Sequence, residues 1–287
     1  MTYFDVKLEF NHAILHDIII DYAANRKKGY VCVVDANVLT MAQKCNVYRE
    51  VINNSTINTC DGGSIAALAG IIHKNKFRAL NGPDLFSHYI EKNIYRQLLL
   101  GSSEEVSNEI KQQLVKKNLD DQHLQVMPLP FLSVDQFDYR SIADSINKIQ
   151  PNIIWVSLGA PKQEIFMSKI LPHLSAGVMF GIGAAFNFYI GKIEIPKFQI
   201  GAFRFIWLSR LIAEPRKLYS RLMGYILLLP KLYFSEREKV KVISKSEKKA
   251  FDNGTMKSNP ERSRPLFWML KYTIIGYKLS YQIIEII

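Results

Sequence analysis

The sequence predicts an α/β protein in which a mostly parallel sheet is covered by helices on both faces. Short apolar runs rich in β-branched residues alternate with helical patterns from residue 30 to about residue 183, which is typical of parallel strands joined by helices. Nearly half of the 287 residues are apolar, enough for one sizeable core. We therefore expect one α/β core with a peripheral extension.

Strands are expected where apolar runs are bounded by polar or turn-forming residues, at 30–35, 56–60, 77–81, 94–100, 123–128, 153–158 and 177–182. Helices are expected between them, and several begin after Asp, Ser or Pro, as the chemistry of helix caps prefers. Their ranges are 38–53, 64–74, 84–92, 103–118, 138–149 and 161–172. The core domain that these elements form is expected to span residues 1–195.

The pattern changes after about residue 190. Residues 196–230 form an Arg-rich, aromatic appendage that we expect to be helical from 201 to 229 and to end before Pro230. The polar stretch 231–264 holds ten Lys or Arg against five Asp or Glu and is expected to be a basic linker. Residues 265–287, wound as a helix, place their few polar side chains along one narrow stripe, which favours an amphipathic helix.

The formal net charge of +11 implies an anionic partner, which can be nucleic acid, acidic lipid or a phosphorylated substrate. The basic linker beside the amphipathic segment favours an anionic membrane surface, with a terminal helix docked on protein as the alternative. No uncharged apolar run approaches the roughly 20 residues that cross a bilayer. The three cysteines are odd in number and lack C-x-x-C spacing, so neither a disulfide framework nor a zinc site is expected. A reducing cytoplasm therefore fits best.

Two acidic strand ends are the first candidates for chemistry. Asp35 and Asn37 follow the first strong strand, and Asp61 and Gly62 follow the next and open a helix. Open α/β sheets bind ligands at the carboxyl ends of their strands, so Asp61 is expected at the mouth of a crevice. The alternative role for Asp61 is the N-cap of the 64–74 helix.

Three more strand ends carry small and polar residues of the kind that bind anions or sugars. A Gly-x-Gly at 181–183 lacks the third position of a dinucleotide fingerprint, so NAD binding receives little weight. The candidates from these three ends are Arg78, Gly82, Asp84, Gly159, Pro161, Lys162, Gln163, Glu164, Gly181, Gly183 and Asn187.

Several of these motifs resemble the WecG/TagA/CpsF glycosyltransferases. They are Leu-Gly-Ala-Pro-Lys-Gln-Glu at 158–164, the Gly-Ile-Gly-Ala-Ala-Phe-Asn-Phe block at 181–188, Trp-Leu-Ser-Arg-Leu at 207–211, Glu-Pro-Arg at 214–216 and Arg-x-x-x-Gly-x-Asp-Leu at 78–85. The resemblance covers about residues 30 to 225. It implies a Rossmann-like fold whose appendage at 196–230 completes the active site, while membrane association is expected of the C-terminal helix at 265–287.

The resemblance also implies a reaction: inverting transfer of a sugar from a UDP-sugar donor to a polyprenyl-diphosphate-linked acceptor. It makes Asp61 the general base, places Asn37 in the sugar crevice and gives diphosphate binding to arginines near Arg78 and in the appendage. The appendage candidates are Arg210, Arg216, Lys217 and Arg221. The implied setting is the cytoplasmic face of the bacterial inner membrane, with peripheral attachment and self-association of the core.

Breaking a glycosyl–phosphate bond leaves negative charge on UDP, which a metal or fixed cations must meet. The sequence has no Asp-x-Asp metal motif, and arginines bind phosphate oxygens in pairs, so no metal and no cofactor are expected. Asp35 stands where the family usually has Thr, and Asn187 where it commonly has Asp. The donor therefore stays open among N-acetylmannosamine, its uronic acid, glucose and galactose.

Three other functions remain as alternatives. A nucleic-acid-binding module would also be basic, but no recognised reading motif is present. A nucleotide-dependent oxidoreductase needs a Gly-x-Gly-x-x-Gly after its first strand, and Asp35-Ala36-Asn37 offers none. A non-catalytic adaptor on the membrane surface would be favoured if Asp61→Asn left the activity unchanged or if no hydrolysis of a donor could be detected.

Overall fold

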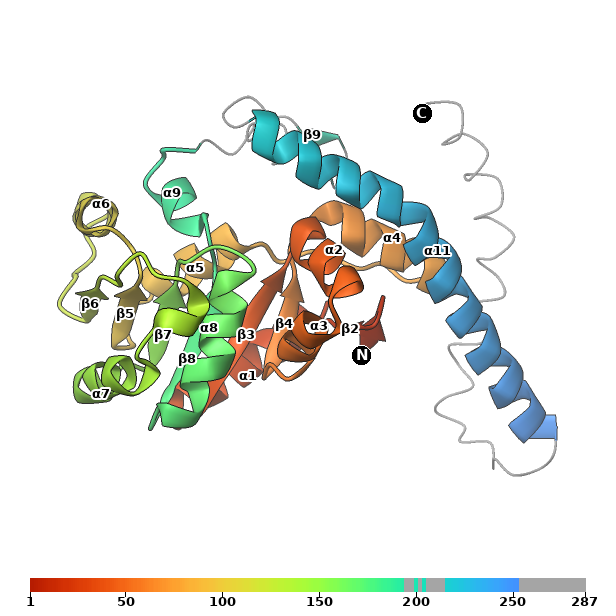
Figure 1. Cartoon of the computed structure of the whole chain (residues 1–287), viewed down its shortest axis with the longest axis horizontal. Coiled ribbons are helices and arrows are strands. Elements are labelled where there is room, and N and C mark those ends of the chain that lie inside the picture. Colours follow the sequence, from red (N-terminus) through yellow and green to blue (C-terminus); the bar gives the residue numbers. More distant parts are fainter. Residues whose placement is uncertain (194–198, 201–202, 205–214, 253–287) are drawn as a thin grey trace. The chain divides into compact units, whose positions relative to one another are not determined.

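The computed structural model describes residues 1–193, 199–200, 203–204 and 215–252. Its centre is a six-stranded parallel sheet with the strand order β4-β3-β8-β7-β5-β6, flanked by helices (Figure 1). The strands are β3 (Lys28–Val34), β4 (Ile57–Cys60), β5 (Gln97–Leu100), β6 (Leu124–Met127), β7 (Ile153–Val156) and β8 (Gly177–Gly181). The expected parallel α/β fold is therefore confirmed.

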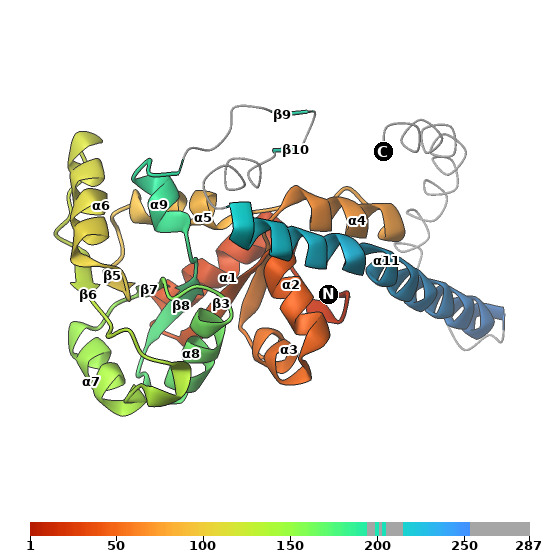
Figure 2. The same ribbon diagram turned by 45° about the horizontal axis from the view of Figure 1, so that its top comes forward.

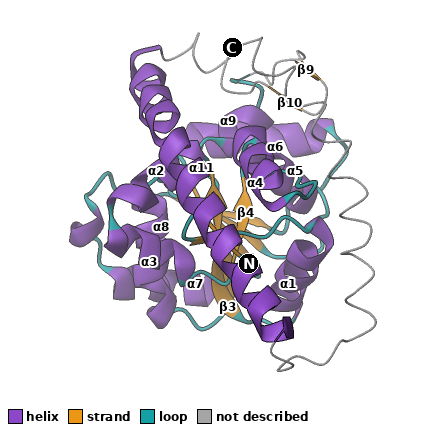
Figure 3. Ribbon diagram, turned by 90° about the vertical axis from the view of Figure 1, so that its right-hand side faces the viewer, coloured by secondary structure: helices purple, strands orange, loops and turns teal. Residues whose placement is uncertain are grey.

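The helices form two layers, one on each face of the sheet, and Figure 3 shows the strands between them. One face carries α1 (His12–Ala24), α5 (Gly82–Ile90), α6 (Glu104–Lys116) and α9 (Ala185–Tyr189). The other carries α2 (Ala36–Lys44), α3 (Asn46–Asn53), α7 (Tyr139–Ile149) and α8 (Lys162–Ile170). The remaining elements of the core are α4 (Gly63–His73) and the short 3-10 helices η1 (Val134–Gln136) and η2 (Leu171–His173).

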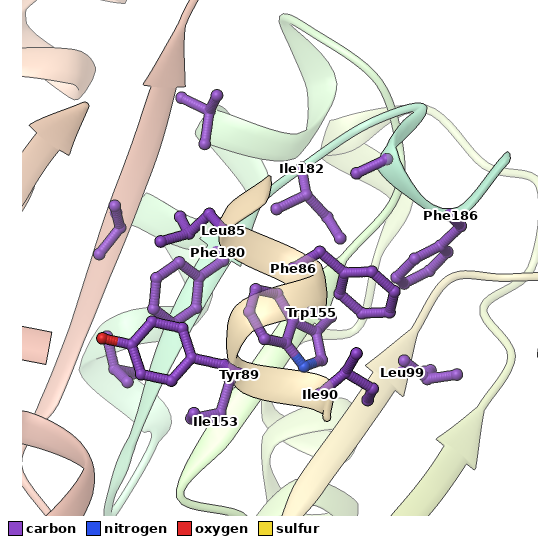
Figure 4. Close-up of a cluster of buried hydrophobic side chains, with 14 of the residues drawn as sticks. Leu85, Phe86, Tyr89, Ile90, Leu99, Ile153, Trp155, Phe180, Ile182 and Phe186 are labelled. Carbon is purple, nitrogen blue, oxygen red and sulfur yellow. The ribbon is translucent and has the colours of Figure 1, made fainter. Parts of the chain in front are cut away.

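A large buried cluster lies under α1, α5, α6 and α9 and includes the aromatic residues Phe86, Trp155, Phe180 and Phe186 (Figure 4). Phe86 meets Trp155 edge to face at 5.0 Å between ring centroids, an arrangement that the ring quadrupoles favour. The indole N–H of Trp155 donates to Gln97 Oε1 at 2.7 Å, so this polar atom is satisfied inside the core. This packing fixes α5 on the strands whose ends form the site.

The direction in which successive strands are added to the sheet reverses between β3 and β8. From β3 the chain moves outward to β4, whereas β5 to β8 all lie on the other side of β3. The helix after β3 is α2 on one face, and the helix after β8 is α9 on the opposite face, beside α5 (Figure 2). In open parallel sheets such a reversal opens the crevice in which ligands bind.

The predicted strand at 77–81 is wrong. Leu80 N donates to Cys60 O at 3.0 Å, but no ladder forms, and Arg78 is exposed. The outer edge of β4 is partly taken by the N-terminus, because Glu9 forms a parallel bridge with Thr59. The N-terminal residues also form a hairpin of β1 (Thr2–Tyr3) and β2 (Val6–Lys7). The sequence analysis predicted neither this hairpin nor helix α1.

Three predicted helices differ from the structure at their ends. The helix expected at 38–53 is two helices, α2 and α3, separated at Cys45, whose backbone is extended. The helix expected at 161–172 ends as the 3-10 turn η2. The helix expected to stop before Pro230 instead runs through it as α11 (Pro215–Asp252).

Residues 231–252, which composition assigned to a linker, are therefore helical, while the expected domain boundaries at 195, 230 and 264 stay predictions. Contacts divide the chain at Arg237, so α11 belongs in part to the unit Met1–Arg237 and in part to the unit that begins at Glu238. In that second unit Lys241 pairs with Glu238 at 2.6 Å. Within the described ranges no helix combines the length and apolarity that crossing a membrane requires. The strands β9 (Gln199–Ile200) and β10 (Phe203–Arg204) pair with each other.

Candidate active site

Asp35 and Asp61 leave neighbouring strands at the same edge of the sheet. Val34 at the end of β3 is paired with Cys60 at the end of β4, and Asp61 N donates to Val34 O at 2.8 Å. Both carboxylates are half-buried. The sequence predicted each as a strand end, and the register shows that the two are adjacent.

The two acids differ in local role. Asp35 is the N-cap of α2, and its Oδ1 accepts from Val38 N at 2.7 Å, a contact worth about 1 kcal/mol. The N-cap of α4 is Gly62, which has no side chain to cap with, so the alternative role of Asp61 as that cap is excluded. Gly62 has a φ of 106°, which an L residue with a side chain adopts only with strain. Gly62 therefore holds the cap position of α4 directly after Asp61.

The start of α5 lies over the reversal point between β3 and β8. A Cβ added at Gly82 would lie 3.6 Å from Val33 Cγ1 and 3.7 Å from Ile182 O, in ordinary van der Waals contact with both, so the start of α5 packs against the ends of β3 and β8. Asn81 caps the helix by accepting from Asp84 N at 2.9 Å and donates to Asp84 Oδ2 at 2.9 Å. Gly82 thus belongs to the strand-end cluster, whereas Asp84 is exposed and has a structural partner.

The ends of β7 and β8 are joined by one side chain. Gln163 Oε1 accepts from Gly159 N at 3.2 Å and from Gly183 N at 3.0 Å. Ser157 Oγ donates to Gly183 O at 2.9 Å, which adds a second bond between the same two loops. The predicted site residues Gly159, Gln163 and Gly183 therefore lie together, linked by hydrogen bonds. Ser157, which was not predicted, belongs to the same cluster.

Glu164 is fully buried beside Gln163. Its carboxylate accepts from Gln163 Nε2 at 2.8 Å and from the hydroxyl of Tyr48 on α3 at 3.0 Å. Burial raises the pKa of Glu164 to about 7, although both hydrogen bonds act in the opposite direction. Burial and the Glu164 charge raise the pKa of Tyr48 in turn. Tyr48 was not among the predicted site residues, because nothing local marks a helix residue that pairs with a carboxylate more than a hundred positions away.

Cys60, which precedes Asp61, is fully buried, and its thiol lies 3.8 Å from Gly62 O. Burial, followed by the charge of Asp61, raises its pKa, so the thiol stays protonated at neutral pH. Cys60 is therefore a small buried side chain of the core.

Two further predicted residues lie at the rim of this edge. Lys162 Nζ is 5.3 Å from the ring centroid of Phe131 and 5.1 Å from that of Phe137, within reach of cation–π attraction. Arg78 is exposed, and its carbonyl accepts from His12 Nε2 at 3.3 Å. Neither contact tests substrate binding, and that role stays a prediction for both residues.

The cationic residues of the appendage lie mostly beyond what the structure describes. Arg210 is outside the described residues, and Arg216, Lys217 and Arg221 are described only as backbone in α11. Asn187 lies on α9, and its carbonyl accepts from Ile193 N at 3.1 Å. The expected convergence of arginines on Asp61 therefore stays a prediction.

Two contacts hold α11 to the core within the unit Met1–Arg237. A Cβ at Gly224 would lie 3.8 Å from Thr40 Cγ2 on α2, so helix α11 passes against the helix that Asp35 caps. Further along, the buried Glu236 accepts from Phe4 N at 3.0 Å and from His73 Nε2 at 3.0 Å. These contacts bring α11 to the side of the sheet where β3 and β4 end.

In the described part of the chain, no three His, Cys, Asp or Glu side chains come together as metal ligands would. One hollow of about 420 Å³ lies on α5 and is lined by Asp84, Ser87, His88, Glu91 and Lys92. It contains neither Asp61 nor Asp35. Among its lining residues Asp84 alone is one of the candidates from the sequence motifs.

Comparison with known proteins agrees with the motifs. The sequence matches the profile of the family described as "Glycosyl transferase WecG/TagA/CpsF" over residues 4–241. A Bacillus spizizenii protein named N-acetylglucosaminyldiphosphoundecaprenol N-acetyl-beta-D-mannosaminyltransferase is 24% identical over 200 residues, which cover 68% of this chain and 76% of the relative. A Bacillus subtilis protein of the same name is 21% identical over 197 residues, which cover 68% of this chain and 75% of the relative. Because the family profile covers most of the 287 residues, the chain belongs to the WecG/TagA/CpsF family and is a glycosyltransferase.

Proposed function

We propose that this glycosyltransferase moves a hexose, an N-acetylhexosamine or the uronic acid of one from a UDP-sugar to a sugar carried on polyprenyl diphosphate, with inversion at the anomeric carbon. The relatives' name specifies an acceptor of this kind, N-acetylglucosaminyldiphosphoundecaprenol. The observation that carries the proposal is the placement of Asp61 beside Asp35 at the carboxyl edge, next to the reversal point of the sheet.

The geometry supports Asp61 as the base in preference to Asp35. A general base must accept a proton from the attacking hydroxyl, and a carboxylate that accepts a helix-cap hydrogen bond is a weaker base because that bond stabilises its charged form. Asp35 accepts such a bond from Val38 N, whereas the cap position of α4 is filled by Gly62. The capping argument therefore counts against Asp35 and does not apply to Asp61.

The proposed step is a single displacement. The acceptor hydroxyl oxygen bonds to the anomeric carbon while the bond from that carbon to the UDP oxygen breaks, and the hydroxyl proton passes to Asp61. Attack from the face opposite UDP inverts the configuration. The charge that develops on UDP is stabilised by the N–H groups of the first turn of α4 and by the cations at 210–221.

The direct test offers the protein a panel of UDP-sugars with a short-chain acceptor of the N-acetylglucosaminyl diphosphate type. One donor should release UDP and yield a product heavier by one sugar. The anomeric configuration of the transferred sugar, determined by NMR, should be opposite to its configuration in the donor. A product of retained configuration, or no transfer with any UDP-sugar, would overturn the proposal. Turnover should also persist in EDTA, since fixed cations are proposed to serve the diphosphate. Loss in EDTA with recovery in Mn²⁺ would contradict that part.

We propose further that the enzyme acts peripherally on the cytoplasmic face of the inner membrane. The supporting observations are the formal charge of +11, with ten Lys or Arg in residues 231–264, and relatives named for an undecaprenol-linked substrate. Each basic residue near an anionic leaflet adds about 1 kcal/mol. The full chain should sediment with phosphatidylglycerol vesicles but not with phosphatidylcholine vesicles. Equal binding by a chain ended at residue 230 would refute the role of the basic stretch.

A further inference from the structure

The buried side chains Tyr48, Glu164 and Gln163 form one continuous hydrogen-bonded series. Tyr48 donates to Glu164 Oε2, and Gln163 Nε2 donates to Glu164 Oε1. The ionised Glu164 carboxylate only accepts and the N–H groups of Gly159 and Gly183 only donate, so the Gln163 nitrogen faces Glu164 and the Gln163 oxygen faces the glycines. Glu164 therefore decides which end of the Gln163 amide points toward the sheet edge.

What Gln163 holds with that oxygen is the carboxyl edge itself. Gly159 N and Gly183 N both donate to it, and these glycines follow β7 and β8, the strand next to β3. Their φ values of 75° and 52° place both in left-handed conformations, so neither loop follows an ordinary strand end. A rotated amide would present its N–H₂ group to two N–H donors, and both loops would lose their acceptor.

The amide has little room to move. A Cβ at Gly181 would lie 3.2 Å from Gln163 Nε2 and 2.8 Å from Met167 Cε, so β8 packs tightly against this side chain. Glu164 itself is fully buried, which excludes direct contact between its carboxylate and a substrate. Its influence on the reaction must therefore pass through Gln163.

We propose that Glu164 is a positioning residue of the transfer reaction: by accepting from Gln163 and Tyr48 it fixes the Gln163 amide so that Gly159 and Gly183 stand in the arrangement that receives substrate. The inference rests on the proposed function and deepens it, because the loops it holds border the edge that carries Asp61. What Glu164 supplies is a hydrogen-bond acceptor at a fixed point and not a charge. Loosely held loops at a reacting site cost rate even when the fold survives.

A pair of variants separates acceptor from charge. Glu164→Gln keeps an acceptor for Gln163 and donates to the Tyr48 oxygen, so its kcat should stay within about threefold of wild type. Glu164→Met has similar length but no comparable acceptor, so its kcat should fall by about tenfold or more. Tyr48→Phe leaves the Glu164–Gln163 bond in place and should fall between the two.

A second measurement does not depend on activity. Amide hydrogen exchange of the segments around Gly159 and Gly183 should quicken in Glu164→Met and stay slow in Glu164→Gln. The proposal is overturned if Glu164→Met retains wild-type kcat and protection, or if Glu164→Gln loses as much as Glu164→Met. If Glu164→Met does not fold, Gln163→Met removes the acceptor of Gly159 N and Gly183 N directly. Unchanged exchange protection of these segments in Gln163→Met also overturns the proposal. If the wild-type protein transfers no sugar, the proposed function fails by itself. The exchange pattern still tests whether Glu164 holds the two glycine loops through Gln163.

Discussion

Because the ionisable side chain of Glu164 is buried, we expect the free energy of unfolding to depend on pH. Burial raises the pKa of Glu164 from an ordinary value of 4.5 to about 7. A tenfold change in acidity corresponds to about 1.4 kcal/mol, so ionising this carboxyl in the folded protein costs about 3 kcal/mol more than in the unfolded chain. Because the folded pKa is the raised one, the stability is fully present below pH 4.5 and is lost as the pH rises through 7.

Glu164→Gln removes this cost because glutamine stays neutral. The variant should match wild type near pH 4.5 and be more stable by about 3 kcal/mol at pH 8. Urea denaturation of both proteins at pH 4.5, 6, 7 and 8 measures the difference in unfolding free energy at each pH. The exposed Glu50→Gln is the matched control and should differ from wild type by less than about 0.5 kcal/mol throughout. A stability difference that does not change with pH, or one that favours wild type at pH 8, would refute the reasoning.

Two other substitutions test the contacts around the site by urea denaturation. Asp35→Ala should lower the unfolding free energy by about 1 kcal/mol through loss of the α2 cap, whereas Asp35→Ser should restore most of it; equal losses in both would show that capping is not the cause. Glu236→Ala leaves the Phe4 N–H and the His73 ring without their acceptor and should cost about 1–3 kcal/mol, while Glu238→Ala, which breaks an exposed pair with Lys241, should cost less than about 1 kcal/mol. A loss at Glu236 no larger than that at Glu238 would show that the buried acceptor does not anchor α11.

The parallel sheet was predictable because its strands are buried on both faces and stand out as short apolar runs. The runs at 30–35, 153–158 and 177–182 became β3, β7 and β8. The run at 77–81 resembles them in sequence, but the edge it would join is shared with Glu9. Competition for a strand edge is a tertiary effect that no local pattern reveals.

Helix ends were less predictable than helix positions. Proline usually ends a helix, yet α11 continues through Pro230. Helix α1 buries Leu15, Ile19 and Ala23 at a spacing of four, but Ile14 and Ile20 are apolar and exposed, so one apolar face does not stand out in the sequence.

The site was predictable as a set of strand ends but not as an arrangement. Sequence alone placed Asp35 and Asp61 after strands, but only the register shows those strands to be neighbours. The Gln163–Glu164 pair was expected to bind substrate, and the structure gives both side chains partners inside the protein. The bond from Tyr48 depends on how α3 packs against α8, which no motif encodes.

The role of Asp61 is the central claim, and its most direct test compares Asp61→Asn with Asp35→Asn in sugar transfer to the diphosphate-linked acceptor. Asparagine caps helices about as well as aspartate, so Asp35→Asn preserves α2 while it removes the neighbouring charge. Loss of a general base typically costs 10²- to 10⁴-fold, so kcat of Asp61→Asn should fall by about that factor while UDP-sugar binding persists. The fall in Asp35→Asn should be much smaller. An Asp61→Asn enzyme that retains kcat within about tenfold of wild type, or a larger loss in Asp35→Asn, would contradict the account.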